Sequence, residues 1–223
     1  MSDYVKLQAS DGQQFNAYVA SPAGKPIGAL VVLQEIFGVN AHIRSVADAY
    51  ATDGFLTVAP ALFDRIEPGV ELGYEGADLQ KALSFTPRIN VEKSLLDVAA
   101  ALDYAAASSG RKAGIIGYCF GGTLAWVAAA RLHPAAAVGY YGGRIGSYAS
   151  ETLVAPVMLH FGSKDAHIPA AEVERVHLAH PEVEIHWYDA GHGFNRDANA
   201  SYEPASARLA RERSLAFFKK YLG

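Results

Sequence analysis

The sequence contains one cysteine and no long apolar run, and both absences restrict the class of protein. A single cysteine cannot form an intrachain disulfide, which favours a reducing compartment. The longest apolar stretches, such as Gly28–Leu33, are far shorter than the roughly 20 residues that cross a bilayer. The first residues also lack the apolar core of a secretory signal. We therefore expect a cytoplasmic protein that has no membrane partner.

Charge is sparse as well. Only 19% of the residues are charged, the net charge is −4, and the lysines and arginines form no basic run. This balance argues against a nucleic-acid partner. The hydrophobic share of 51% supports a large buried core, and 223 residues suit one domain of ordinary size. We predict a single domain over residues 1–223, which acts as a monomer or weak oligomer.

Short apolar runs alternate with longer segments of helical periodicity along most of the chain. This alternation predicts an α/β fold with a mostly parallel central sheet, helices on both faces, and an N-terminal β-hairpin around Asp11 and Gly12. The predicted strands are Val5–Ala9, Gln14–Ala20, Ala29–Gln34, Leu56–Ala59, Ala113–Gly117, Ala136–Tyr140, Val157–Phe161 and Val183–Tyr188. The predicted helices are Ala41–Asp53, Val91–Ala107, Gly122–Leu132, Ala170–His180 and Pro204–Tyr221.

Local signals mark some of the helix ends. Asn40 and Asn90 stand where N-caps belong, and Gly110 follows a long helical segment as a terminator. The stretch 60–88 is less regular and contains several glycines and prolines. A connection of that length is usually a functional loop or a small helical cap, and the sequence leaves both open.

The segment Gly117–Gly121 has the pattern Gly-x-Cys-x-Gly between a predicted strand and a predicted helix. This is the pattern of a nucleophile elbow with cysteine in place of serine. The glycines suit a strained turn, and the start of the following helix favours a thiolate and an oxyanion. We predict that Cys119 is the nucleophile. The alternative is a buried structural cysteine.

A nucleophile of this kind needs a base and a group that orients the base. Asp165 follows one predicted strand and His192, between two glycines, follows the next, in the order that α/β-hydrolases use. We predict that they complete a catalytic triad, the alternative for Asp165 being a turn or N-cap residue. The other seven histidines are interpreted as packed or surface residues. His177 and His180 have no third ligand, so no metal site is expected.

Four segments together resemble the dienelactone hydrolase family, or carboxymethylenebutenolidases, of the α/β-hydrolase superfamily. They are Gln34–Asn40 (Gln-Glu-Ile-Phe-Gly-Val-Asn), Gly117–Gly122 (Gly-Tyr-Cys-Phe-Gly-Gly), Val138–Gly142 (Val-Gly-Tyr-Tyr-Gly) and His192–Arg196 (His-Gly-Phe-Asn-Arg). The resemblance extends over nearly the whole chain. It implies opening of an enol lactone to a maleylacetate-like product, without a metal or organic cofactor.

The same resemblance assigns further roles. It implies that Glu35 holds the thiol and then takes its proton, against the alternative of an ordinary exposed glutamate. It implies an oxyanion hole formed by the backbone N–H groups of Ile36 and Phe120. Tyr141 and Arg196 match positions that bind substrate, where Arg196 would pair with a substrate carboxylate unless it forms only a surface salt bridge.

One departure from the family pattern concerns the substrate. Family members of the chlorocatechol pathway carry a second carboxylate-binding arginine in the region read here as Gly69–Ser84, which contains no arginine. Arg65 and Arg88 flank this region, and either is a possible replacement.

The expected function is hydrolysis of a small activated ester or lactone, most favourably of the dienelactone type. A thiolate is a good nucleophile for substrates whose leaving group is already good, such as an enolate. Two alternatives stay open: a general carboxylesterase or thioesterase on the same triad, and a non-hydrolytic thiol sensor in which Cys119 is oxidised or binds a ligand.

Overall fold

The computed structural model describes residues 2–223. The strands are β1 Ser2–Gln8, β2 Gln14–Ala20, β3 Gly28–Leu33, β4 Phe55–Pro60, β5 Ala113–Tyr118, β6 Ala137–Tyr140, β7 Val157–Gly162 and β8 Glu184–Tyr188. The helices are α1 Ala41–Thr52, α2 Gly76–Phe85, α3 Val91–Ser109, α4 Phe120–Arg131, α5 Ala170–Ala179 and α6 Pro204–Leu222, with short 3₁₀ helices at Leu62–Arg65, Thr86–Arg88 and Ile145–Tyr148. Every predicted strand and helix is present, with ends displaced by a few residues.

The chain divides into two compact units. The first runs to Gly114 and includes Leu222, and the second runs from Ile115 to Tyr221 and includes Gly223. Each unit is described by itself. The prediction of one domain stays a prediction.

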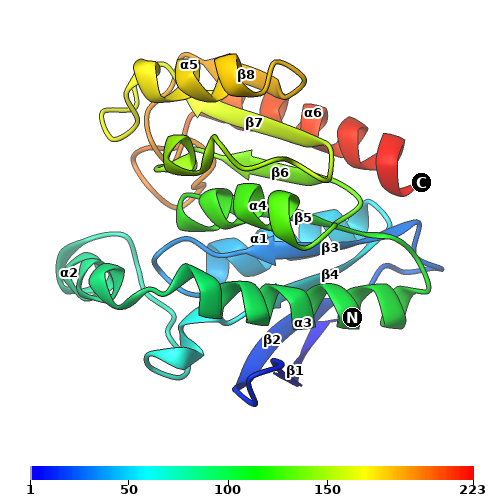
Figure 1. The fold of residues 1–223 in the computed structure, drawn as a ribbon. Helices are drawn as coiled ribbons and strands as arrows, with labels where there is room; N and C mark the ends of the chain where they lie inside the picture. The colour runs from blue at the N-terminus through cyan, green and yellow to red at the C-terminus, as the bar shows by residue number, and fades with distance from the viewer. Residues whose placement is uncertain (1) are drawn as a thin grey trace. The chain divides into compact units, whose positions relative to one another are not determined.

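The first unit contains the predicted hairpin and an α/β arrangement. Strands β1 and β2 are antiparallel, and the turn between them contains Gly12 at φ 87°, a left-handed conformation that glycine adopts without strain. Strand β2 pairs antiparallel with β4, which pairs parallel with β3. Helices α1 and α3 both contact these strands and lie on opposite faces (Figure 1). The hairpin is therefore confirmed.

The predicted helix ends are confirmed by their hydrogen bonds. The Asn40 side chain accepts from the Ile43 N–H at 3.2 Å, and the Asn90 side chain accepts from the Lys93 N–H at 3.0 Å. Helix α3 ends at Gly110, whose φ of 62° is left-handed. In the stretch 60–88 the structure forms α2 and two 3₁₀ helices, so this region is largely helical.

The second unit is a parallel sheet in the order β5-β6-β7-β8. Helices α4 and α6 lie on opposite faces of it (Figure 1). Helix α4 packs so closely on β6 that a Cβ added to Gly122 would lie 2.6 Å from the Tyr140 carbonyl oxygen. Because the strands are parallel, the loops after β5, β6, β7 and β8 leave the sheet at the same edge.

Candidate active site

Cys119 lies in a sharp turn between β5 and α4. Its backbone has φ 53° and ψ −114°, a conformation that a non-glycine residue rarely adopts. A Cβ on Gly117 would lie 1.9 Å from the Gly121 carbonyl oxygen, so glycine is required at position 117 for lack of space. The strand before the cysteine and the helix after it are both where the elbow pattern predicts them.

The elbow is fixed by hydrogen bonds to the strand beside it. The Cys119 N–H donates to the Tyr140 carbonyl at 3.0 Å, and the Cys119 carbonyl accepts from the Thr123 N–H at 3.1 Å. The Thr123 hydroxyl donates to the Gly143 carbonyl. The turn after β5 is therefore tied to the turn after β6, and the backbone around the sulfur is firmly held.

Asp165 and His192 meet at this same edge of the sheet. His192 Nδ1 lies 2.7 Å from Asp165 Oδ2, and the side chains are 16% and 1% exposed respectively. The second oxygen, Asp165 Oδ1, accepts from the His167 N–H at 2.8 Å. The carboxylate is thus bonded on both oxygens and fixes the orientation of the imidazole.

Electrostatics favour a charged imidazole. Burial lowers the pKa of His192, but hydrogen bonds to the side chains of Asp165 and Cys119, with the charges of both groups, outweigh burial and raise this pKa to about 9. Burial raises the pKa of Asp165, yet the hydrogen bond and charge of His192 and the His167 N–H bring the net shift below the usual value. Cys119 and Asp165 thus contact His192 from two sides, and both interactions favour the charged imidazole.

Tyr141 and Arg196 lie beside His192. Tyr141 is buried directly after β6, with φ 37°, and its ring centroid is 5.0 Å from that of His192. The Arg196 guanidinium carbon lies 5.9 Å from the centroid of the Tyr141 ring. A Cβ on Gly193 would lie 2.5 Å from the same guanidinium carbon, so the arginine folds back over the histidine loop.

Two features of this site were missed from the sequence. His167, read as a packed or surface residue, presents its ring edge-on to His192 with 5.3 Å between centroids. The only local signal was its place two residues after Asp165. His160, also read as packed, is the centre of a buried hydrogen-bond network that is described below. Within residues 2–223 no group of three or more His, Cys, Asp or Glu could hold a metal ion.

Glu35 and Ile36 belong to the first unit and follow β3. Glu35 is fully buried, so the alternative of an exposed glutamate is wrong. The neighbouring Gln34 side chain donates to the Glu35 carbonyl at 3.2 Å and accepts from the Leu62 N–H at 3.1 Å. Ile36 lies half-buried in the turn that follows, and Phe120 is the first residue of α4.

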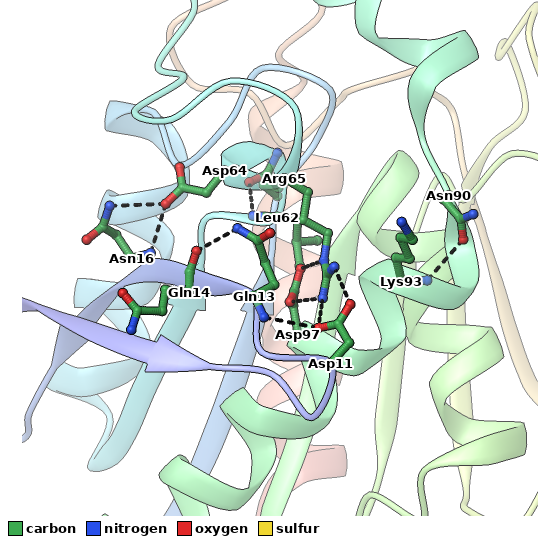
Figure 2. A network of polar contacts seen from close by, with 11 residues as sticks. Asp11, Gln13, Gln14, Asn16, Leu62, Asp64, Arg65, Asn90, Lys93 and Asp97 are labelled. Atoms are coloured by element: carbon green, nitrogen blue, oxygen red, sulfur yellow. Dashed lines mark hydrogen bonds and ion pairs between the residues drawn. The ribbon is translucent and has the colours of Figure 1, made fainter.

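Arg65 is not available as a second carboxylate-binding arginine. Its guanidinium bonds Asp11 at 2.7 and 3.0 Å and Asp97 at 2.7 and 2.8 Å (Figure 2). Its side chain is only 11% exposed. Arg88 is exposed, and its guanidinium donates to the Ile66 carbonyl at 3.3 Å. Of the two possible replacements, Arg65 is therefore already held by two carboxylates, and Arg88 stays a possible replacement.

A parallel α/β sheet, with a strained residue at the start of a helix and a bonded Asp–His pair on later loops, has the architecture of an α/β-hydrolase. Comparison with known proteins identifies the family within this class. The model of the dienelactone hydrolase family matches residues 15–222, and the chain belongs to this family. It is a hydrolase that acts on esters or lactones.

Proteins similar to this chain align with it over almost its full length. A carboxymethylenebutenolidase of Pseudomonas putida is 34% identical over 226 residues, covering 97% of this chain and 96% of the relative. Carboxymethylenebutenolidase 1 of Cupriavidus pinatubonensis is 32% identical, covering 96% and 95%. A Klebsiella pneumoniae protein crystallised as a candidate dienelactone hydrolase has a TM-score of 0.86 and 31% identity, covering 99% and 100%. The predicted α/β-hydrolase fold is confirmed. Among residues 2–223, no helix combines the length and apolarity needed to span a membrane.

Proposed function

We propose that this protein opens a small activated lactone or ester that carries a carboxylate, of the dienelactone type, with Cys119 as nucleophile. The observation that carries the proposal is the continuous row Cys119–His192–Asp165 at the elbow. The names of the curated relatives support the lactone class. A structural cysteine would have no need of a strained backbone and a bonded histidine–aspartate pair.

The chemistry follows from the row of three side chains. The Cys119 thiolate attacks the carbonyl carbon, so a C–S bond forms and the π electrons move to the oxygen. The oxyanion collapses, the C–O bond breaks, and the leaving oxygen takes the proton from His192. Water then attacks the thioester while His192 takes a proton from it, and the C–S bond breaks to restore the thiolate. No metal or cofactor takes part in this proposal.

Backbone N–H groups stabilise the oxyanion in the proposed mechanism. Phe120 supplies one from the first turn of α4, where the helix dipole also favours negative charge. Ile36 supplies the other, from the turn after β3. One such donor typically contributes about 2.7–4 kcal/mol to transition-state stabilisation.

Glu35 is proposed as the group that holds the thiol, accepts its proton when substrate binds to give the attacking thiolate, and returns that proton to the sulfur after the thioester is hydrolysed. Its complete burial supports this role, because a carboxyl group away from water exchanges protons only with the groups around it. Glu35→Gln keeps the shape and removes the proton acceptor, so turnover should fall at least about tenfold. An unchanged turnover and pH profile in this variant would make Glu35 a structural residue.

The decisive experiment concerns Cys119. Cys119→Ala should lose at least about 10³-fold in turnover of p-nitrophenyl acetate and of an enol lactone, with an unchanged melting temperature. Iodoacetamide should inactivate the wild type in step with labelling of this one thiol, and a bound carboxylate ligand should slow both. Full activity after complete alkylation would exclude covalent catalysis.

A substrate panel then separates the candidate functions. Faster hydrolysis of anionic enol lactones than of open-chain esters supports the dienelactone type. The engagement of Arg65 by two aspartates favours the alternative, a general small esterase or thioesterase, because it removes one cation that a carboxylate would need. Equal rates for neutral and anionic substrates would decide for that alternative. Labelling without any turnover would indicate a thiol sensor. A cytoplasmic location and a monomeric or weakly oligomeric state remain predictions.

A further inference from the structure

A buried row of polar side chains runs beneath the strand ends that carry the site. His160 on β7 is fully buried, and its Nδ1 lies 2.8 Å from the Tyr188 hydroxyl on β8. Its Nε2 lies 3.0 Å from the Ser214 hydroxyl on α6, the helix on the face opposite α4 (Figure 1). We call this row the strand-end network; it consists of Tyr140, His160, Tyr188, Arg213 and Ser214.

On the Tyr188 side of His160, the hydrogen-bond partners indicate which atom donates and which accepts. Arg213 can only donate, and it donates from Nη1 to the Tyr188 oxygen at 3.0 Å. The Tyr188 oxygen accepts this bond, and its own proton is then available to donate to His160 Nδ1. Because Nδ1 accepts, the proton of an uncharged His160 is on Nε2.

The hydrogen bonds on the Ser214 side of His160 agree with a proton on Nε2. The Ser214 hydroxyl donates to the Ala210 carbonyl at 2.8 Å, which can only accept. Its oxygen is left to accept from His160 Nε2 at 3.0 Å and from the Tyr140 hydroxyl at 2.8 Å. Every donor of the Tyr140, His160, Tyr188 and Ser214 side chains therefore has an acceptor, and only one arrangement of protons satisfies all of them.

The surroundings keep His160 uncharged. Burial lowers the pKa of His160 well below its usual value, and the positive charges of His186 on β8 and Arg213 on α6 lower it further. Burial also raises the pKa of Tyr188, against the opposing effect of Arg213. Both shifts favour the uncharged forms of His160 and Tyr188 on which this hydrogen-bond order depends.

The backbone carbonyls of the same strand ends hold the loops of the site. The Tyr140 carbonyl accepts from the Cys119 N–H at 3.0 Å, and the His160 carbonyl accepts from the Tyr141 N–H at 2.7 Å. The Tyr188 carbonyl accepts at 2.8 Å from Ser163, in the loop that leads to Asp165, and at 2.8 Å from Ala190, in the loop that leads to His192. Side chains that lock these strand ends therefore also fix all four loops.

Phe194 connects the histidine loop to the strand-end network a second time. It is fully buried two residues after His192. Its ring centroid lies 6.0 Å from that of Tyr140 and 5.2 Å from that of Tyr188. Since both tyrosines bond directly or through Ser214 to His160, the surface that supports Phe194 depends on the same histidine.

We propose that His160, through its two ring hydrogen bonds to Tyr188 and Ser214, is a positioning residue that sets Cys119, Asp165 and His192 at reacting distance. This inference rests on the proposed function, because it takes these three side chains as the catalytic set. His160 does not touch the reacting atoms. It acts by holding the ends of β6, β7 and β8 in one arrangement.

The test compares three variants. His160→Leu removes both ring hydrogen bonds, whereas His160→Gln offers an acceptor oxygen and a donor N–H that can replace them. Ser214→Ala removes one partner with little change of volume. We expect kcat for p-nitrophenyl acetate to fall about 10- to 100-fold in His160→Leu and about 3- to 10-fold in Ser214→Ala, with KM nearly constant. His160→Gln should stay within about threefold of the wild type.

A second readout needs no turnover. NMR titration of His192 and the pH dependence of Cys119 alkylation both report how closely Cys119, His192 and Asp165 interact. The groups that face His192 are Cys119, Asp165, His167 and Tyr141, with Arg196 behind Tyr141. In His160→Leu and Ser214→Ala the His192 pKa should fall below about 9, because the bond to Asp165 loosens. A wild type that titrates normally but hydrolyses nothing would contradict the proposed function and leave the positioning result intact.

His180 provides the matched control. It is also a buried histidine with both ring nitrogens bonded, to Glu182 at 2.9 Å and to the Ala149 carbonyl at 2.9 Å. His180→Leu should lower the melting temperature and leave kcat and the His192 titration unchanged. If His160→Leu behaves in the same way, or if His160→Gln loses as much activity as His160→Leu, the proposal is wrong. Should His160→Leu fail to fold, Ser214→Ala decides by the same criteria.

Discussion

The two units of the chain each contain a polar network, and the networks are built on different principles. In the first unit Arg65 joins Asp11 and Asp97 by charge (Figure 2). In the second unit the strand-end network has one charged member, Arg213 at its end, and its other side chains, Tyr188, His160, Ser214 and Tyr140, are uncharged. The network of Arg65 ties a hairpin turn to α3, and the strand-end network lies under the loops of the proposed catalytic residues.

The difference has an electrostatic reason. Next to His192, the proposed general base, an additional mobile charge would move the histidine pKa. The uncharged part of the strand-end network, from Tyr188 to Tyr140, gives rigidity without that disturbance. The first unit uses charges instead, and the hydrogen bonds of Arg65 lower the pKa of Asp11 to about 2. Burial raises the pKa of Asp97, which Arg65 only partly opposes.

The largest expected effect separates two buried aspartates. Asp165→Asn should reduce kcat about 10³- to 10⁴-fold, because the imidazole loses its orientation and its charged partner. The alkaline limb of the pH profile, set by His192 at about 9, should move to lower pH, since burial then acts unopposed by the Asp165 charge. Asp97→Asn should leave kcat per folded molecule unchanged. An equal loss of kcat in both variants would contradict the division between the two networks.

The next effect is on stability. Arg65→Met leaves the fully buried Asp97 carboxylate without its partner and should cost about 3 kcal/mol in the free energy of unfolding. Urea denaturation measures this cost. The double variant Arg65→Met/Asp97→Leu should recover part of it, because no buried charge remains. A single variant as stable as the wild type would show that the ion pairs contribute nothing.

A third, smaller effect concerns the two arginines. Arg196→Met should reduce kcat/KM for anionic lactones about 10- to 100-fold, the range expected for a hydrogen bond to a charged group, and hardly change hydrolysis of p-nitrophenyl acetate. Arg65→Met should show no such selectivity, and the exposed Arg175→Met serves as a surface control. Equal loss for neutral and anionic substrates would mean that Arg196 holds the His192 loop instead.

The smallest effect is the pH dependence of stability, which should have opposite signs in the two units. The pKa of His192 is raised from 6.5 to about 9, so its contribution is complete below pH 6.5 and is lost as pH rises through 9, by at most about 1.4 kcal/mol per pH unit. The pKa of Asp11 is lowered from 3.8 to about 2, so its contribution is present above pH 3.8 and is lost as pH falls through 2.

Urea denaturation across this pH range measures both contributions. His192→Gln should flatten the alkaline slope only, and Asp11→Asn the acid slope only. An alkaline slope that persists in His192→Gln would assign the effect to another group.

The sequence was informative wherever a short segment determines its own structure. Asn40 and Asn90 cap helices because their side chains reach backbone N–H groups only three residues away. The need for glycine beside Cys119 could be predicted from the sequence, because the clash that a Cβ on Gly117 would cause is with Gly121 of the same motif. Helix α2 could not be read in this way, since only Ala82 and Phe85 among its residues are buried and its N-cap, Glu75, makes no capping hydrogen bond through its side chain.

The sequence by itself determined the order of the strands and of every helix except α2 and the short 3₁₀ helices, together with the elbow and the loops that carry Asp165 and His192, because each depends on neighbouring residues or on strand direction. Only the tertiary structure decided the partners of Arg65 and His160. Arg65 bonds an aspartate 54 positions away, and His160 bonds a serine 54 positions away. Hydrogen bonds between such distant residues leave no periodic trace in the chain, since they form only after the separate strands and helices have packed together.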